Sequence, residues 1–410
     1  MTTAIDPAIA MQAGAPRDTG LRDRIRAVAD TLREDAPACD ELGRVTDVTA
    51  DALRSTGILK MLHPKDFGGL EGHPTEFMEG VIEVGSLNSS AGWVSGVVGV
   101  HPHEVALASR ELQEEIWGDK APLGPETLIA SPYAPGGTLV PTEGGYIFNG
   151  RWGYSSGNEL CQWVTIGAFK ADADGVVRDR TAVHVAVPAS DYEVIQGSWE
   201  VFGLRGTGSK DLVITDAFVP EHRVIELEAV TEGSAAPAAG RGDAPVFYLP
   251  RNVVFSGAVA AATIGISKGV IDTFVEVTRD REARHGKASQ DPFQLAALGR
   301  ASAEVDASIV QHLHDIDRAY AYCLRGEVVP MWLRAEIRRN QAAAADRATR
   351  AADSLFRITG GAGIHVGNGL ERRWRDSQAA MHHISNLTEP VWQSWGLLHF
   401  GHQPLPTVKF

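Results

Sequence analysis

The residues best placed to do chemistry lie near the C-terminus, in the stretch ITGGAGIHVGNGLERRWRDSQAAMHHISN (358–386). It joins a glycine turn (360–363) to a basic and aromatic run and then to a histidine pair, His382 and His383. Clustered glycines let the backbone approach a ligand closely and free amide donors for an anion. A histidine along the helix that follows can act on a group held at that turn. Spacing alone also fits a helix end, a loop and a solvated basic helix.

Composition excludes several classes of protein. The chain has 410 residues, 44% of them apolar, and a net charge of -14, which disfavours nucleic-acid binding. No apolar run approaches the roughly 18 residues of a membrane span, and the N-terminus does not resemble a signal peptide. Three distant cysteines, Cys39, Cys161 and Cys323, form neither a disulfide framework nor a metal knuckle. We therefore expect a cytoplasmic protein without a structural metal.

The residue pattern changes twice along the chain. Residues 1–20 have the composition of a flexible tail, and 21–123 carry mostly helical periodicity. Residues 124–230 show short β-branched and aromatic runs bounded by turn residues, as in a small β-barrel. A low-complexity linker over 231–244 precedes a helical bundle over 245–410. The order predicts an α+β fold.

Individual elements follow from the same periodicities. The predicted strands are 146–152, 163–168, 182–188 and 211–219, and the predicted helices are 21–34, 45–59, 74–84, 90–108, 111–117, 253–278, 292–325, 331–359 and about 370–386.

Five stretches in this order carry a family resemblance: SSAGWVSGVVGVHPHEVAL (89–107), ASPYAPGG (130–137), GGYIFNGRWGYSSGNELCQW (144–163), SWEVFGLRGTGSKDLVITDAFVPEHR (198–223) and RRWRDSQAAMHH (372–383). Together they resemble the acyl-CoA dehydrogenase superfamily. Within it they are similar to the oxygenase components of two-component flavin-dependent monooxygenases, such as those acting on a phenolic secosteroid and, more distantly, on p-hydroxyphenylacetate. The resemblance implies a helical N-terminal domain, a central β-barrel and a C-terminal four-helix bundle.

The carboxylate base of acyl-CoA dehydrogenases is missing from both places where that superfamily keeps it. The GGxGxxxE pattern would put a glutamate where this chain has Gly367, and the alternative place on an upstream helix holds Pro250. Without that base, removal of the α-proton of a thioester substrate lacks a proton acceptor. The sequence therefore favours the monooxygenase branch.

The resemblance implies an oxygenase that hydroxylates a small aromatic, phenol-like and possibly polycyclic substrate through a C4a-(hydro)peroxyflavin. Reduced FMN is the expected cofactor, with FAD as the alternative, and O2 is the oxidant. A dinucleotide fingerprint after a strand is missing, so a separate NAD(P)H-dependent flavin reductase is expected as partner. The relatives imply a homotetramer. An N-hydroxylating or S-oxidising enzyme and a dehydrogenase-like flavoprotein remain alternatives.

The resemblance assigns the catalytic roles to three residues. His383 lies nine residues after Trp374 and would donate a hydrogen bond to, or exchange protons with, the oxygenated flavin. His101 would take the proton of the substrate hydroxyl, because histidine is a base near neutral pH. Ser156, or its neighbour Ser155, would place a hydroxyl near the flavin N5. The alternatives are a surface histidine, a helix-end histidine and an ordinary turn.

Further residues are expected to contact the flavin. Arg284, or Arg281 in another register, would reach a flavin phosphate, although a lone arginine is commonly solvated. GLRGTG (203–208) is interpreted as a β-turn, since it lacks the Lys-Ser/Thr ending of a phosphate loop. The other expected cofactor contacts are Trp93, Ser131, Tyr133 and Tyr154, whose aromatic members can instead be core, together with Gly361 and Ala362 of the glycine turn.

Overall fold

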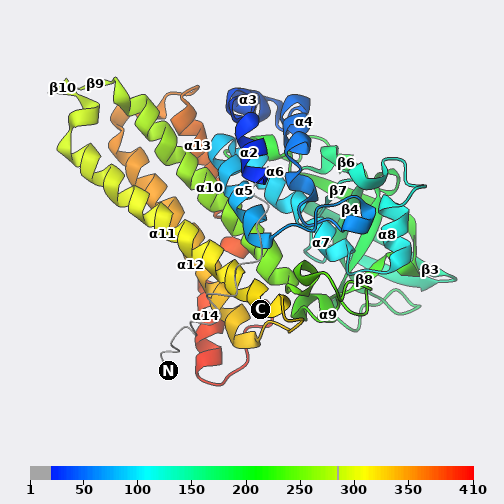
Figure 1. Ribbon diagram of the computed structural model, residues 1–410. Coiled ribbons are helices and arrows are strands. Elements are labelled where there is room, and N and C mark those ends of the chain that lie inside the picture. The colour runs from blue at the N-terminus through cyan, green and yellow to red at the C-terminus, as the bar shows by residue number, and fades with distance from the viewer. Residues whose placement is uncertain (1–19, 284–285) are drawn as a thin grey trace.

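A computed structural model describes residues 20–283 and 286–410. Figure 1 shows three parts: N-terminal helices, a β domain beside them, and a long helical bundle. This is the predicted α+β arrangement. The N-terminal helices are α2 (Gly20–Ala27), α3 (Ala29–Leu42), α4 (Asp47–Thr56), α5 (Pro74–Leu87), α6 (Ser89–Gly99), α7 (His101–Val105) and α8 (Arg110–Trp117).

Helix α6 is buried on every side, which explains its almost wholly apolar sequence. Asn88 caps it by accepting a hydrogen bond from the backbone N–H of Ala91. The single predicted helix 90–108 is wrong, because a new short helix, α7, begins at His101. Pro102 stands in its first turn, where the missing N–H costs no helical hydrogen bond. The break places His101 at the start of α7.

The central domain is all β, as predicted. Eight strands form one sheet with the order β6-β7-β3-β2-β4-β5-β8, and β1 pairs with β4. In the part of the chain that is described, β6 and β8 are the edges, so the expected barrel takes the form of an open sheet. The strands are β1 (Ile129–Ala130), β2 (Gly137–Thr142), β3 (Gly145–Ser155), β4 (Trp163–Lys170), β5 (Ala182–Pro188), β6 (Glu193–Ile195), β7 (Lys210–Pro220) and β8 (Val224–Glu226).

The connection from sheet to bundle is packed against the rest of the protein. It begins with helix α9 (Leu227–Glu232) and ends in a 3-10 turn at Pro245–Tyr248. Within it, the guanidinium of Arg241 is only 8% exposed and pairs with Asp66 at 2.5 Å. The low-complexity composition of this segment therefore coexists with fixed contacts.

The C-terminal bundle is built from α10 (Arg251–Arg279), α11 (Pro292–Cys323), α12 (Met331–Ile358) and α13 (Gly369–Ala380). Helix α10 is long and apolar enough to cross a membrane, but 89% of its most apolar window is buried inside the protein. It packs against α5, where a side chain on Gly265 would lie 2.4 Å from the carbonyl oxygen of Ile82. Glycine therefore lets the two helix backbones touch.

Helix α13 ends earlier than the sequence predicts. It stops at Ala380, and His383 lies three residues beyond, at the start of a 3-10 turn, Ile384–Asn386. The assumption that His382 and His383 share one helix is therefore wrong. A further helix, α14 (Thr388–His399), was not predicted.

Candidate active site

Three aromatic side chains meet where the N-terminal helices contact the bundle. Trp93 on α6 meets the imidazole of His383 edge to face, with ring centroids 5.6 Å apart. Phe255, one turn into α10, lies 6.0 Å from the same imidazole. Such spacings are those of packed aromatic pairs. The structure thus sets His383 between the indole and a phenyl ring rather than in open solvent.

The protonation of His383 follows from its surroundings. Its Nδ1 accepts a hydrogen bond from the backbone N–H of Ser385 at 3.1 Å. Burial lowers the pKa of His383 to about 4, and the positive charge of Arg338 lowers it further. The imidazole is therefore neutral near pH 7, and its proton must lie on Nε2. His383 is a hydrogen-bond donor at Nε2.

A chain of hydroxyls starts beside Trp93. The indole N–H donates to Ser156 at 3.1 Å, and the Ser156 hydroxyl lies 2.6 Å from that of Ser209. Ser209 in turn lies 2.7 Å from Thr207, which donates to the carbonyl of Leu204. Following the donors along this chain, the hydrogen of Ser156 points to Ser209. The Ser156 hydroxyl therefore accepts one hydrogen bond and donates another within the protein.

The neighbouring Ser155 differs from Ser156. Its side chain is fully buried, and its Oγ has no hydrogen-bond partner among the described residues. A buried hydroxyl without a partner costs about 1–3 kcal/mol, so such groups mark sites completed by a ligand or by water. Of the two serines, Ser155 has the free hydroxyl.

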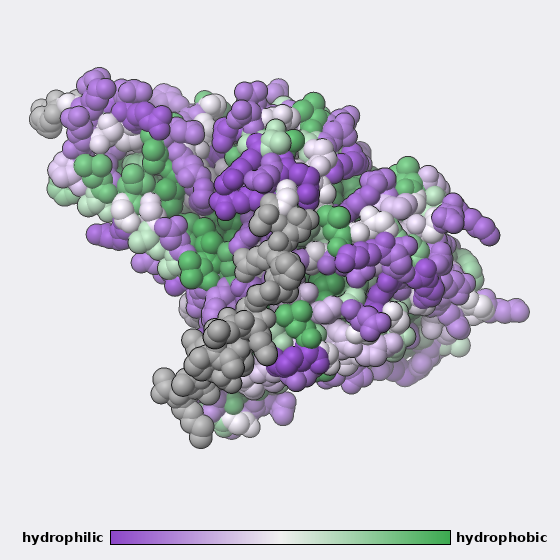
Figure 2. Space-filling view, in the orientation of Figure 1, coloured by the Kyte–Doolittle hydropathy of each residue, from purple (hydrophilic) through white to green (hydrophobic). Residues whose placement is uncertain are grey.

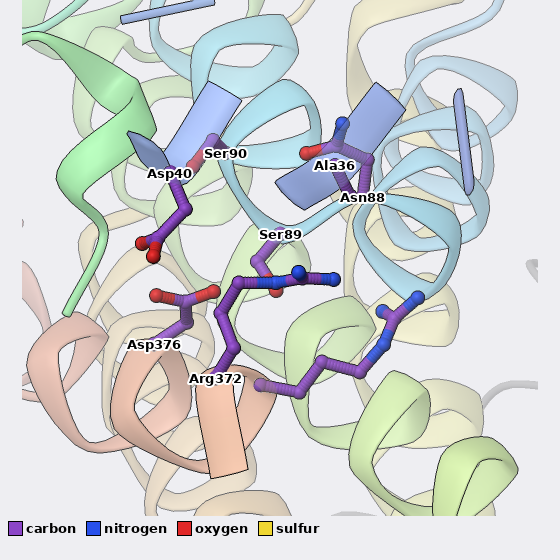
Figure 3. Close-up of a pocket in the computed structure, with 8 residues that line it drawn as sticks. Ala36, Asp40, Asn88, Ser89, Ser90, Arg372 and Asp376 are labelled. Carbon is purple, nitrogen blue, oxygen red and sulfur yellow. The ribbon is translucent and has the colours of Figure 1, made fainter. Parts of the chain in front are cut away.

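The loop that carries this hydroxyl chain is fixed by Asp376 on α13. Asp376 is 3% exposed, and its Oδ1 accepts the backbone N–H of Leu204 at 2.7 Å. Burial raises the pKa of Asp376, and the Leu204 N–H opposes that rise. Figure 3 shows Asp376 facing Asp40 across a small polar cleft that also holds Arg372 and Ser89. This cleft lies outside the aromatic site.

The second histidine, His101, also contacts Phe255. Its Nδ1 lies 2.7 Å from the hydroxyl of Tyr133, and its ring is 6.5 Å from that of Phe255. Its Nε2 is buried and has no hydrogen-bond partner in residues 20–283 and 286–410. Burial lowers the pKa of His101 to about 3, so it too is neutral near pH 7. Phe255 thus contacts both imidazoles.

A buried charged group stands behind His101. Glu104, also on α7, accepts a hydrogen bond from His184 Nδ1 at 2.5 Å, and each side chain is 2% exposed. Burial alone would raise the pKa of Glu104, but His184 and Arg251 outweigh it and hold the pKa at about 2. The imidazole of His184 stacks on Tyr133 at 4.3 Å, with an angle of 6°. Tyr133 therefore links the charged pair to His101.

Other predicted site residues lie elsewhere. Ser131 directly follows β1 and is half-buried. Tyr154 is 77% exposed, has a left-handed backbone (φ 67°) and meets Trp199 at the surface. Gly361 and Ala362 are exposed in the turn before α13, at the opposite end of that helix from His383.

The two arginines considered for a flavin phosphate differ in what is known of them. Arg284 lies outside the described residues. The register alternative Arg281 donates to the carbonyl of Thr359 at 2.8 Å, so it lies beside the glycine turn.

Sequence reasoning missed Phe255, Glu104 and His184. His184 stands on the apolar strand TAVHVAVP, and Glu104 in the apolar helix HPHEVAL. An ionisable residue at a core-facing position is a usable signal, because burial is tolerated only when the group is paired. Phe255 gave no signal, since one aromatic residue in an apolar helix resembles ordinary core.

An indole, a phenyl ring and an imidazole lie in contact with one another, and the unpartnered buried hydroxyl of Ser155 is next in the chain to the serine that accepts the indole N–H. Planar apolar surface with a few fixed polar groups is typical of a cofactor site. On this scaffold, the arrangement is that of a flavoprotein oxidoreductase.

Comparison with known proteins also indicates a flavoprotein. Residues 258–387 match the acyl-CoA dehydrogenase C-terminal domain family. A pigment production hydroxylase of Rhodococcus erythropolis is 41% identical over 384 residues, 93% of this chain and 96% of that protein. A flavin-dependent monooxygenase, oxygenase subunit HsaA, of Rhodococcus jostii is 36% identical, over 92% of this chain and 97% of that protein. The crystal structure of 3-HSA hydroxylase from Rhodococcus sp. RHA1 superimposes with a TM-score of 0.88 at 34% identity, covering 95% and 99% of the two chains.

The chain therefore belongs to the family of flavin-dependent monooxygenase oxygenase subunits built on the acyl-CoA dehydrogenase fold. It is an enzyme whose cofactor is a flavin.

Proposed function

We propose that this protein hydroxylates a phenol-like aromatic substrate with reduced flavin and O2, as the oxygenase half of a two-component system. The observation that carries the proposal is the pair of neutral imidazoles, the half-buried His383 and the buried His101, which both contact Phe255. One can donate a hydrogen bond and the other can receive a proton. An aromatic hydroxylation needs both functions, at the oxygen donor and at the substrate hydroxyl.

The residues present fit a reduced flavin, which supplies the electrons that activate O2. Trp93 offers a flat apolar surface, and the Ser155 hydroxyl is buried and free among the described residues. His383 would donate its Nε2–H to a flavin held beside Trp93. These groups exclude water and hold hydrogen bonds in place, which limits the loss of oxidising equivalents as hydrogen peroxide.

The substrate hydroxyl is assigned to the His101 side. Nε2 of His101 accepts the phenolic proton, which raises the electron density of the ring for attack on electrophilic oxygen. Phe255 and Tyr133 supply the apolar contacts to the substrate ring, since their centroids lie 4.8 Å apart beside His101.

A homotetramer, a separate reductase and a cytoplasmic location complete the proposal. Helix α13 has 12 residues, so the glycine turn and His383 are about 18 Å apart along it. Gly361 and Ala362 can then best contact a flavin across a subunit interface. Figure 2 shows apolar side chains exposed on the bundle. The exposed apolar side chains of the C-terminal part of the chain include Phe293 at 83% exposure and Val366 at 91%. Such exposure favours burial between subunits.

Acyl-CoA dehydrogenase chemistry is disfavoured. Gly367 takes the position of the usual glutamate base, and its φ of +88° would strain any other residue there. Pro250 occupies the alternative position, at the start of α10. Neither position carries a carboxylate, and at Gly367 the backbone itself disfavours one.

Anaerobic titration with reduced FMN and with reduced FAD tests the cofactor, and we expect tighter binding of FMN. A screen of phenols for product formation coupled to O2 consumption then tests the reaction. If amines or thioethers turn over while no phenol does, an N-hydroxylating or S-oxidising enzyme replaces this proposal. Unchanged turnover of a phenol in His101→Ala would contradict the role of His101.

A further inference from the structure

The turn that holds His383 is itself held by a buried arginine of the bundle. The turn is the 3-10 segment Ile384–Asn386, and the backbone N–H of its Ser385 donates to His383 Nδ1 at 3.1 Å. The carbonyl oxygen of the same Ser385 accepts a hydrogen bond from Nη2 of Arg338, on α12, at 2.6 Å. Ser385 is buried, so this carbonyl needs a partner within the protein. The residue that fixes the tautomer of His383 is therefore fixed in turn by Arg338.

The positive charge of Arg338 is buried and unbalanced. Its side chain is 7% exposed, and its Nη1 is buried without a hydrogen-bond partner in residues 20–283 and 286–410. Burial lowers the pKa of Arg338 to about 10, so it stays charged near pH 7, and no carboxylate of the described residues counters this shift. Arg251 on α10, by contrast, lies 3.6 Å from the carboxylate of Glu104. A buried charge without a counter-charge is costly, and a neutral amide could hold the Ser385 carbonyl, so the charge itself calls for a function.

We propose that Arg338 is a positioning residue for His383: it holds the Ser385 turn by a hydrogen bond and sets a fixed positive charge beside the imidazole, so that His383 stays neutral with its proton on Nε2. The hydrogen bond orients Ser385, whose N–H occupies Nδ1 and leaves the ring hydrogen to Nε2. The charge makes a second proton on the same ring unfavourable. Both actions converge on one donor atom.

The groups around His383 support this assignment. The rings that pack against the imidazole are the indole of Trp93 on α6 and the phenyl ring of Phe255 on α10, and neither of them titrates. Burial lowers the pKa of His383, and the charge of Arg338 lowers it further. In the part of the chain that is described, Arg338 is the one charge that shifts this pKa. No nearby carboxylate therefore favours the imidazolium.

The inference rests on the proposed function, because a neutral imidazole with a hydrogen on Nε2 is the donor that the proposed reaction requires. A measurement on flavin-free protein lets the two fail separately. The probe is the imidazole of His383 itself, in full-length protein with ¹⁵N-labelled histidine, since the two ring nitrogen shifts report tautomer and protonation. His383→Gln assigns the signals. Near pH 7, wild-type protein should carry the ring hydrogen on Nε2.

Three variants of Arg338 separate its hydrogen bond from its charge. Arg338→Met removes both, so the population with the hydrogen on Nδ1 should rise by about fivefold, as for one lost hydrogen bond, and the pKa of His383 should rise. Arg338→Lys restores a donor and a charge and should return both values toward wild type. Arg338→Gln keeps a donor without the charge, so it should raise the pKa of His383 by about one unit even if Arg338→Met does not fold. Wild-type nitrogen shifts in Arg338→Met, or an unchanged pKa in Arg338→Gln, would overturn the inference.

Arg334→Met is the matched control. Arg334 lies one turn earlier on α12, is 6% exposed and also has a buried Nε without a partner among the described residues. It donates to the carbonyl of Phe410 at 3.0 Å and not to the His383 turn. Arg334→Met should leave the tautomer and the pKa of His383 at wild-type values, and an effect as large as that of Arg338→Met would overturn the specific role of Arg338. A wild-type protein that oxidises reduced flavin but hydroxylates no phenol would contradict the proposed function, and the nitrogen shifts would still decide the role of Arg338.

Discussion

His383 and His101 both contact Phe255 and are both neutral near pH 7, but their Nδ1 atoms have different hydrogen-bond partners. His383 is held at Nδ1 by a backbone N–H, which fixes its proton on Nε2. His101 is held at Nδ1 by the hydroxyl of Tyr133. A neutral imidazole has one donor and one acceptor nitrogen, so the partner at Nδ1 decides the role of Nε2. The comparison teaches that a backbone N–H fixes His383 as a donor at Nε2, whereas a hydroxyl, which can donate or accept, leaves Nε2 of His101 free to accept.

The largest effect is expected at the acceptor. His101→Ala should lower hydroxylation of an ordinary phenol by about 10²–10⁴-fold, the usual contribution of a general base. Oxidation of reduced flavin should continue, with hydrogen peroxide released in place of product. The measurement is product and peroxide formed per flavin oxidised.

A matched control and a rescue sharpen this result. His103→Gln replaces the other buried histidine of α7, whose Nε2 meets the carbonyl of Val246 at 3.0 Å, and should leave the product yield near wild type. Phenols already ionised at the assay pH should recover much of the lost rate in His101→Ala. If ionised phenols do not recover the rate, His101 does not act as the acceptor of the substrate proton.

Loss of the donor should behave differently. His383→Leu should cut product per flavin oxidised by about 10²-fold, as for removal of one fixed hydrogen-bond donor. The loss should be the same for neutral and ionised phenols, because the substrate proton is not involved. His382→Gln, a change at the exposed neighbour, is the control and should leave the yield unchanged.

The loop that contains Leu204 is linked to Trp93 through Ser156, so it should support the His383 side of the site and not the His101 side. Asp376→Ala leaves the N–H of Leu204 buried without its acceptor, which should lower the free energy of unfolding by about 1–3 kcal/mol. Urea unfolding measures this loss. The ratio of the hydroxylation rates of neutral and ionised phenols should not change, and a change would show that the His383 and His101 sides of the site are coupled.

Lowering the pH should reduce the stability of the folded protein through both His101 and His383. The pKa values of His101 and His383 are lowered by burial from 6.5 to about 3 and about 4. Between pH 6.5 and 4 the unfolded chain therefore binds more protons than the folded protein, so stability falls as the pH falls. Each such histidine contributes up to about 1.4 kcal/mol per pH unit.

Urea midpoints measured from pH 7 to pH 4 test this slope. His312→Gln removes another buried histidine, whose pKa is lowered to about 4 and which lies on α11 near the backbone of Gly257. The slope of the variant should be shallower than that of wild type. An equal slope would contradict the neutral assignment of the buried imidazoles.

The smallest effect is expected at Tyr154. Its ring is 77% exposed, so Tyr154→Phe should change the free energy of unfolding by less than about 0.5 kcal/mol. If Tyr154→Phe also lowers the affinity for reduced flavin, the result supports the flavin contact that the sequence predicts for Tyr154.

The sequence was sufficient where local patterns decide structure. Strand 182–188 and the long bundle helices follow from periodicity, and the relatives support the fold and the flavin. It was insufficient where a distant contact decides. The end of α13, the pairing of Glu104 with His184, and the occupied hydroxyl of Ser156 all depend on residues far away in the chain. The roles of individual site residues stay predictions.

The glycine contact between α10 and α5 has a consequence for the active site. Because Gly265 brings the two backbones together, helix α10 cannot slide or rotate against the N-terminal helices without a collision. Phe255 stands on that same helix, about 15 Å away along it. A single methyl group added at Gly265 would therefore push α10, and with it Phe255, away from the N-terminal helices that carry His101.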